Sequence, residues 1–179
     1  GLAVGGVFEA GEAEADTEAL LKARMAEVPA LLKAFQEARA GEGKALQAVL
    51  ERQIGEIERL TLASDAAATA RASGQEEALK AAVAKVMGVT EAVEPARLAQ
   101  ELAILAVKTD VTEEIDRLNA HVAQARELIA AKEPVGRRLD FLMQEFNREA
   151  NTLCSKSQST ELTRLGLDLK TVIDQMREQ

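Results

Sequence analysis

Apolar residues recur every three or four positions along most of this chain, which is the period of an amphipathic helix. The first apolar stripe starts after about Asp16. It contains Leu21, Met25, Val28, Leu32 and Phe35. Pro29 interrupts the stripe, and because proline has no backbone N–H to donate, we expect a kink or a new helix start there. Residues 1–13 contain four glycines and little periodicity, so they predict an irregular start.

A second helical stretch follows Gly41 and Gly43, which weaken the turn between the two stretches. Its apolar positions are Leu46, Leu50, Ile54, Ile57 and Leu60. Residues 63–75 are small and polar, and they predict a helix with a mobile surface or, alternatively, a flexible turn near Gly74. Another helix is predicted over residues 76–87.

Proline and glycine divide the C-terminal half into further helices. These are predicted to begin at about Pro95, Asp110, Arg137 and Ser159. Asp110 stands three residues before Glu113, which is the spacing of a capping box, so a helix is predicted from there to about Lys132. Pro134 and Gly136 separate it from the next helix, which is predicted to end near residue 153.

The last helix has the most regular apolar seam. Its heptad-like positions are Leu162, Leu165, Leu169, Val172 and Met176. Such a seam is typical of an interface with a partner helix, and an intramolecular hairpin is equally compatible with it. We expect copies of the chain to associate through seams of this kind.

The composition favours an all-α fold. Hydrophobic residues make up 47 % of the chain, whereas aromatic residues make up 2 % and Trp and Tyr are absent. Because sheets are enriched in β-branched and aromatic residues, this balance favours packed helices. We predict long antiparallel helices that form an extended helical bundle or a coiled-coil-like assembly.

The formal net charge of −8 argues against nonspecific nucleic-acid binding through bulk charge, so any phosphate contact needs a local basic cluster. The sequence has no apolar run of membrane-span length and no signal-peptide pattern, and the single Cys154 cannot form an internal disulfide. We expect a cytoplasmic protein without a membrane partner. Because the chain starts at Gly1 without methionine and stops at Gln179 inside a periodic helix, we expect a piece of a longer protein.

Two polar stripes carry the candidate chemistry, each with positions separated by four, three and four residues. The first stripe contains Asp110, Glu114, Arg117 and His121, and the second contains Glu145, Glu149, Thr152 and Lys156. At about 100° per residue, each stripe occupies a narrow arc beside the apolar face of its helix. Carboxylates and an imidazole on facing helices can hold a divalent metal such as manganese, magnesium or zinc. A metal there could activate water and neutralise a scissile phosphate.

Simpler roles are also open for these residues. Glu145 and Glu149 can be solvated charges in helix ion pairs with Arg148 and Lys156, each pair worth a few tenths of a kcal/mol. Asp110 can be only a helix cap. A lone histidine is more often a polar residue at the edge of a core than a ligand.

The metal hypothesis makes a geometric prediction. Pro134 and Gly136 supply a reversal that makes the two helices antiparallel neighbours. Packing their apolar faces together brings the two stripes to one groove edge. His121 should therefore converge with Glu145 and Glu149, with basic side chains between the carboxylates when no metal is bound.

Residues 136–157 combine arginine, lysine and side-chain amides around one helix and its end. The candidate phosphate-binding residues are Arg137, Arg138, Asn147, Arg148, Asn151 and Lys156, together with Arg117 on the preceding helix. Such side chains suit contacts to a phosphate backbone despite the acidic total. A buried hydrogen-bond network at a subunit interface is the alternative interpretation.

The same segment carries a resemblance to a known family. VGRRLDFLMQEFNREANTLCSKS followed by ELTRLGLDLKTVIDQMREQ resembles the C-terminal signature of the YicC family of bacterial proteins. RLAQELAILAVKTDVTEEIDRLNAHV and EARAGEGKALQAVL are similar to earlier stretches of that family. The chain then divides into residues 1–28, the tail of an N-terminal domain and a first helix, residues 29–96, a long helical hairpin, and residues 97–179, the signature domain.

The resemblance implies a metal-dependent endoribonuclease that is often activated by manganese, with magnesium as the alternative ion. It implies RNA as the substrate and a ring-like homo-oligomer, a hexamer in the full-length protein, of a kind described as stress-induced. It also implies that most of a β-containing N-terminal domain, with part of the RNA-binding surface, is absent from this sequence.

On this hypothesis, the catalytic residues are Glu114, His121, Glu145 and Glu149. His121, Glu145 and Glu149 would bind the metal. Arg117, Arg148 and Lys156 would stabilise phosphate charge. The alternative function is a non-catalytic helical module that supports oligomerisation or binds RNA or an RNA-decay protein.

Overall fold

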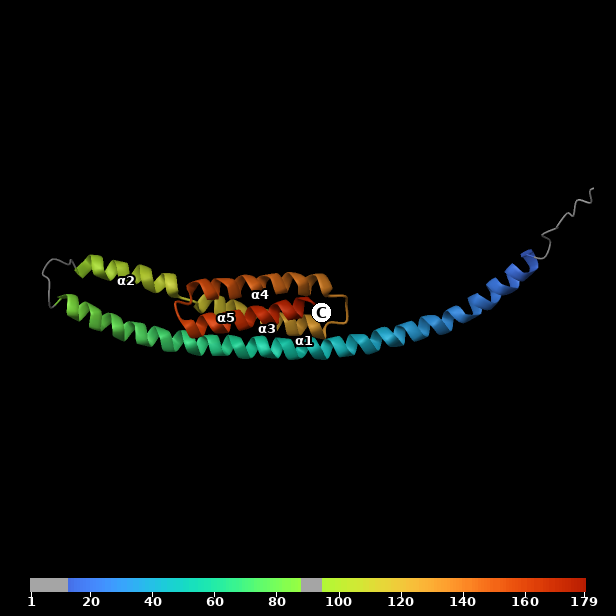
Figure 1. Cartoon of the computed structure of the whole chain (residues 1–179), viewed down its shortest axis with the longest axis horizontal. Helices are drawn as coiled ribbons and strands as arrows, with labels where there is room; N and C mark the ends of the chain where they lie inside the picture. The colour runs from blue at the N-terminus through green and yellow to red at the C-terminus, as the bar shows by residue number, and fades with distance from the viewer. Residues whose placement is uncertain (1–12, 88–94) are drawn as a thin grey trace, which may run out of the picture. The chain divides into compact units, whose positions relative to one another are not determined.

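The computed structural model describes residues 13–87 and 95–179, and every regular element in them is an α-helix (Figure 1). The helices are α1 (Ala13–Met87), α2 (Pro95–Thr109), α3 (Thr112–Ala130), α4 (Gly136–Lys156) and α5 (Thr160–Arg177). The predicted all-α fold is confirmed for this part of the chain. None of these helices combines the length and the apolar character that a membrane span needs.

α1 is one continuous helix of 75 residues. The new helix start predicted at Pro29 and the alternative turn near Gly74 are wrong, because both residues lie inside α1. Alanine, leucine and glutamate are frequent around them, and the summed preference of such strong helix formers outweighs about 1 kcal/mol per glycine and about 3 kcal/mol for proline. Residues 29–87 of the predicted helical hairpin form part of α1. Most of the irregular start predicted for residues 1–13 lies outside the described residues.

The chain divides into two units, Gly1–Ala45 and Leu46–Gln179. In the first unit the described side chains of α1 are all exposed. They include the complete first apolar stripe, with Leu21 and Met25 each 62 % exposed and Phe35 58 % exposed. The domain boundaries expected after residues 28 and 96 stay predictions.

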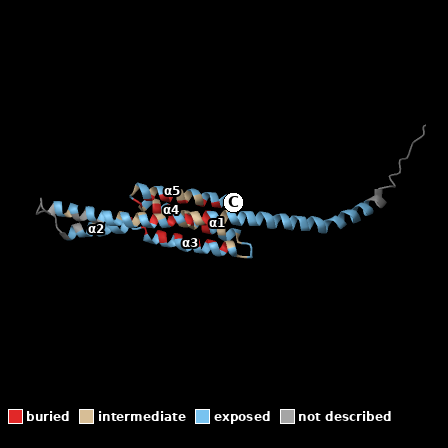
Figure 2. Cartoon of the chain, turned by 90° about the horizontal axis from the view of Figure 1, so that it is seen from below, coloured by how far each residue is buried: buried red, intermediate tan, exposed pale blue. Residues whose placement is uncertain are grey.

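The second unit has one hydrophobic core, built from the middle of α1 and from α3, α4 and α5 (Figure 2). Its completely buried side chains include Ile57, Leu118, Phe146, Leu162 and Ile173. Burial of such a side chain stabilises the fold by roughly 1.5–3 kcal/mol. α2 contributes little to this core, because its described residues are mostly exposed.

The apolar seam of α5 faces this core. Leu162, Leu165, Leu169 and Met176 are buried, and Val172 packs against the same core. The intramolecular interpretation of the seam is therefore correct, and the seam is not open to a partner helix. α5 lies so close to α4 that a Cβ added to Gly166 would stand 2.4 Å from Cys154 Sγ, so the cysteine side chain would have to move. Self-association through other surfaces stays a prediction.

The start of α3 differs from the predicted capping box. Asp110 Oδ1 accepts hydrogen bonds from Thr112 Oγ1 at 2.7 Å and from the Thr112 backbone N–H at 2.9 Å, and the helix begins at Thr112. These bonds, the hydroxyl's first, lower the pKa of the Asp110 carboxyl. Glu113 pairs with Arg117 one turn further along instead of reaching back to the helix start. The predicted spacing therefore found the helix start but not the bonds that form it.

Candidate metal centre

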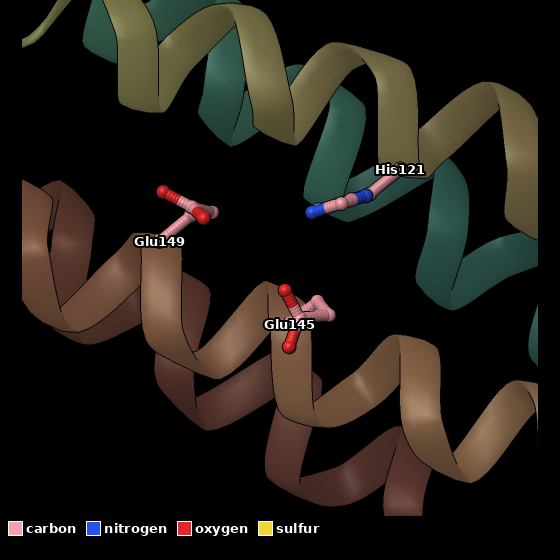
Figure 3. Close-up of side chains that lie close together, drawn as sticks. All are labelled: His121, Glu145 and Glu149. Carbon is pink, nitrogen blue, oxygen red and sulfur yellow. The ribbon is translucent and has the colours of Figure 1, made fainter.

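α3 and α4 are joined by a short connection that contains Pro134, and they pack against each other as neighbours. This packing brings His121 of α3 towards Glu145 and Glu149 of α4 (Figure 3). One nitrogen or oxygen atom of each residue lies within 4.8 Å of those of the other two. The predicted convergence of His121 with the two glutamates is confirmed.

The imidazole of His121 is held at the edge of the core. Its ring meets the Phe146 ring edge-on, with 5.4 Å between the centroids and 70° between the planes. Burial lowers the pKa of His121, and the nearby carboxylates of Glu149 and Glu145 offset part of that effect. Because the lowered pKa favours the neutral imidazole at neutral pH, a ring nitrogen can offer a lone pair to a metal.

The Nε2 atom of His121 is buried and has no hydrogen-bond partner. In Figure 3 the ring points into the space between the two glutamates. A buried polar atom without a partner is rare in native structures because it loses its hydration without compensation. A metal bound at Nε2 would compensate for that loss.

The two carboxylates have different environments. The Glu149 side chain is only 3 % exposed and accepts one hydrogen bond, from Arg117 Nη1 at 3.3 Å. The Glu145 side chain is 29 % exposed, and its Oε2 lies 3.9 Å from Arg148 Nη1. Both carboxylates thus keep oxygen lone pairs available. Two carboxylates and one imidazole form a donor set that suits manganese, magnesium or zinc.

Arg117 connects this cluster to its exposed rim. One guanidinium nitrogen donates to Glu149, and the other donates to Glu113, four residues earlier on α3. The Glu113 and Glu149 carboxylates raise the pKa of Arg117, so the guanidinium stays positively charged. The structure therefore has a basic side chain against the most deeply buried carboxylate of the cluster, as predicted for a metal-free arrangement.

Glu114 was predicted to act with the cluster, but it lies outside the group of three. Its side chain is 5 % exposed, and Oε1 accepts a hydrogen bond from Lys156 Nζ at 2.7 Å. Glu114 and Lys156 therefore form an ion pair, although Glu114 Oε2 is buried without a hydrogen-bond partner. The predicted contact of Lys156 with a phosphate stays a prediction.

Arg71 of α1 supports the same end of α4, and no sequence pattern predicts this role. Its guanidinium donates to the carbonyl oxygens of Thr109 at 2.5 Å and Lys156 at 3.2 Å, and also to that of Ser157. These bonds join α1 to the ends of α2 and α4. Sequence patterns miss such a residue because backbone carbonyls distant in sequence are its partners.

The remaining predicted phosphate ligands are distributed along α4, and of them Arg148 lies beside the cluster. Arg148 is exposed beside Glu145, whereas Arg138 pairs with Glu133 at 2.9 Å near the start of α4. At about 1.5 Å per residue, Arg138 lies about 16 Å along the helix from Glu149. Arg137 is exposed at the same end as Arg138. Asn147 donates to Asp174 at 3.2 Å, and Asn151 donates to Asn147 at 3.5 Å.

A larger hollow in the second unit lies apart from these residues. It has a volume of about 910 Å³ and is lined mainly by small and apolar side chains of α1 and α2 and by the start of α3. The lining includes Ala68, Ala72, Leu102, Leu105 and Val111. None of the three clustered residues lines it, so size alone does not mark the candidate centre.

Comparison with known proteins identifies the family. Residues 63–179 match the model of the C-terminal region of YicC-like endoribonucleases. This chain belongs to the YicC family. The family predicted from the segment around residues 136–157 is thereby confirmed.

Two relatives show how much of a YicC protein is represented here. The probable endoribonuclease YicC of Haemophilus influenzae is 36 % identical over 174 residues, which cover 97 % of this chain and 59 % of that protein. The probable endoribonuclease YicC of Clostridioides difficile is 34 % identical over 157 residues, covering 84 % of this chain and 51 % of that protein. The chain thus spans between half and three fifths of these YicC proteins, and the clustered residues lie within residues 63–179, which match the model of the C-terminal region.

Proposed function

We propose that this chain is the part of a divalent-metal-dependent endoribonuclease that holds the metal. The observation that carries the proposal is the group of His121, Glu145 and Glu149, whose ligand atoms lie within 4.8 Å of one another. The two relatives are named probable endoribonucleases, which supplies the reaction class of the proposal. The family model covers all three residues.

In this proposal each clustered residue has a separate task. His121 offers its neutral imidazole, Glu149 offers a buried carboxylate, and Glu145 offers a carboxylate that is accessible from solvent. A bound divalent ion would lower the pKa of a coordinated water and neutralise charge on the scissile phosphate. The imidazole favours manganese over magnesium, because magnesium prefers oxygen ligands almost exclusively.

RNA would reach the centre from the exposed side of Glu145. Arg148 lies there with a side chain 69 % exposed, and Arg117 is 49 % exposed, so both can turn towards a phosphate. Guanidinium groups are well suited to phosphates because their planar N–H groups match two oxygens at once. We assign Arg117 and Arg148 to the substrate, and Glu114 with Lys156 to the support of α3 and α4.

The direct test is cleavage of labelled RNA by the purified chain, with and without Mn²⁺. We expect cleavage that needs the ion and that falls about 100-fold or more in His121→Ala and Glu149→Gln, since both lose a metal ligand. Glu127→Gln is the matched control, because Glu127 is an exposed glutamate of α3 outside the cluster. Equal cleavage by His121→Ala and the wild type would contradict the proposed centre.

A second candidate function is a non-catalytic module for assembly or partner binding. It is favoured by the exposed apolar stripe of α1 from Leu21 to Phe35, because long exposed apolar stripes usually meet another surface. The occupant would be a second copy, within a hexamer of the complete protein, or an RNA-decay protein. A chain that binds RNA or self-associates in light scattering, yet cleaves no RNA with Mn²⁺, would support this function over the first.

A further inference from the structure

The charge partners of Glu149 are arranged unusually for a buried carboxylate. The side chain is 3 % exposed, so water contributes little to its solvation. Its described partner is a single guanidinium N–H of Arg117 at 3.3 Å, which is longer than the usual 2.7–2.9 Å of a charge-assisted bond. The carboxylate is therefore neutralised, but only by a loosely held group.

Arg117 divides its contacts between two carboxylates. Its second nitrogen donates to Glu113, whose side chain is 67 % exposed, while the Arg117 side chain itself is 49 % exposed. Arg117 can therefore leave Glu149 and remain paired with Glu113 at the surface. Such a movement changes one side chain and leaves the helix intact.

From this geometry we propose that Arg117 is an internal competitor of the metal at Glu149. The guanidinium occupies the buried carboxylate in the metal-free protein and moves to the rim when a divalent ion binds. At the rim it is then available to an RNA phosphate. This inference rests on the proposed metal centre and adds that metal affinity and phosphate binding are coupled through one arginine.

The neighbouring cations do not fit this role. Lys156 pairs at 2.7 Å with Glu114, which lies outside the cluster. Arg148 stands 3.9 Å from Glu145, whose carboxylate is partly solvated and needs less compensation. Two positive charges cannot both lie close to one buried carboxylate without repulsion, so the ion and the Arg117 guanidinium exclude each other there.

The test is the binding of Mn²⁺ to the chain, measured by calorimetry and by the electron paramagnetic resonance signal of the unbound ion. Arg117→Gln removes the competing charge and should lower the Kd for Mn²⁺ about tenfold or more. Arg117→Lys keeps the charge and should bind Mn²⁺ within about threefold of the wild type. Arg126→Gln is the matched control on α3, because Arg126 pairs with Glu58 away from the cluster, and its Kd should not change.

A second measurement uses the wild-type chain and does not depend on the folding of Arg117→Gln. The Nε–H resonance of Arg117, assigned through its loss in Arg117→Lys, should shift when Mg²⁺ or Zn²⁺ is added, whereas that of Arg126 should stay in place. Mg²⁺ and Zn²⁺ are used here because they are diamagnetic.

The outcomes separate this inference from the proposed function. Mn²⁺ binding by the wild type with equal or weaker binding by Arg117→Gln would overturn the competition and leave the metal centre in place. An unmoved Arg117 resonance at saturating Mg²⁺ or Zn²⁺ would overturn it as well. Absence of Mn²⁺ binding in both the wild type and Arg117→Gln would overturn the metal centre and the inference together. Mn²⁺ binding by Arg117→Gln but not by the wild type would also support the competition, because Arg117 would then prevent the ion from binding.

Discussion

Glu114 on α3 and Glu149 on α4 are buried to almost the same extent, 4 % and 3 % exposed, yet their surroundings differ. Glu114 has a close partner in Lys156 at 2.7 Å, whereas Glu149 has a distant one in Arg117 at 3.3 Å. Glu149 also has an imidazole and a second carboxylate within 4.8 Å, and Glu114 does not belong to that group.

Burial of a carboxylate therefore does not by itself indicate a functional site. The charge of Glu114 is balanced by Lys156 at 2.7 Å from Oε1, although Oε2 is buried without a hydrogen-bond partner. A loosely paired carboxylate beside an orphaned nitrogen has unused bonding capacity, which an ion can take up. The predictions below test whether the two glutamates differ in this way.

The largest effect is expected at the tight pair. Lys156→Met keeps most of the apolar stem but leaves Glu114 buried without its partner, which should lower the free energy of unfolding by about 2–3 kcal/mol. Urea unfolding followed by circular dichroism measures this change. Lys132→Met, at an exposed position after α3, is the control and should stay within about 0.5 kcal/mol of the wild type. A Lys156→Met chain as stable as the control would show that the pair contributes nothing.

The next largest effect is stabilisation of the fold by bound metal, which should differ between Glu114 and Glu149 variants. An ion that binds only the folded chain stabilises it by about 2.7 kcal/mol at a concentration one hundred times its Kd. We expect Mn²⁺ to raise the thermal unfolding temperature of the wild type and of Glu114→Gln, but not that of Glu149→Gln. Equal Mn²⁺-induced shifts in both variants would remove the distinction between the two sites.

A smaller effect is expected from Arg117→Gln without metal. The Arg117–Glu149 ion pair is longer than the Lys156–Glu114 pair, and the Arg117 side chain is half-exposed. Its loss should therefore lower the urea midpoint by less than Lys156→Met does. In the presence of Mn²⁺, the urea midpoint of Arg117→Gln should equal that of the wild type, whereas the midpoint of Lys156→Met should stay below it. A destabilisation larger than that of Lys156→Met would mean that Arg117 is mainly a structural residue.

The smallest effect concerns pH. Burial lowers the pKa of His121 below its ordinary value of 6.5, so near and below that pH the unfolded chain binds the proton more readily than the folded one. The contribution of His121 to stability is therefore complete above about pH 6.5 and decreases as the pH falls from there through the lowered pKa. His121→Gln should show a flatter dependence between pH 7.5 and pH 5 in urea unfolding, as those limits bracket the ordinary pKa. Parallel curves would indicate that His121 has the same pKa in both states.

Much of the fold and of the centre could be predicted from residue spacing. The intervals between Glu145, Glu149 and the apolar residues of α4 fix which side of the helix the carboxylates occupy, and the break at Pro134 makes the two helices neighbours. Helix boundaries were less predictable. The penalty of a single proline, such as Pro29, or of a single glycine competes with helix propensities that are summed along the whole helix. The role of Glu114 stays a prediction, but its ion pair with Lys156, forty-two residues later, could not be predicted, because no local pattern encodes that pair.

The helical character of this chain, its apolar faces and its family can all be read from the order of its residues. These properties depend on a period of 3.6 residues and on short sequence motifs, both of which are local. Which apolar faces are covered follows only from the packing of the helices. The stripe from Leu21 to Phe35 and the seam from Leu162 to Met176 have the same kind of periodicity, yet the first is exposed and the second lies in the core. The tertiary structure likewise decided which acids meet His121 and which cations compensate them, because burial and charge pairing depend on contacts between residues that are distant in sequence.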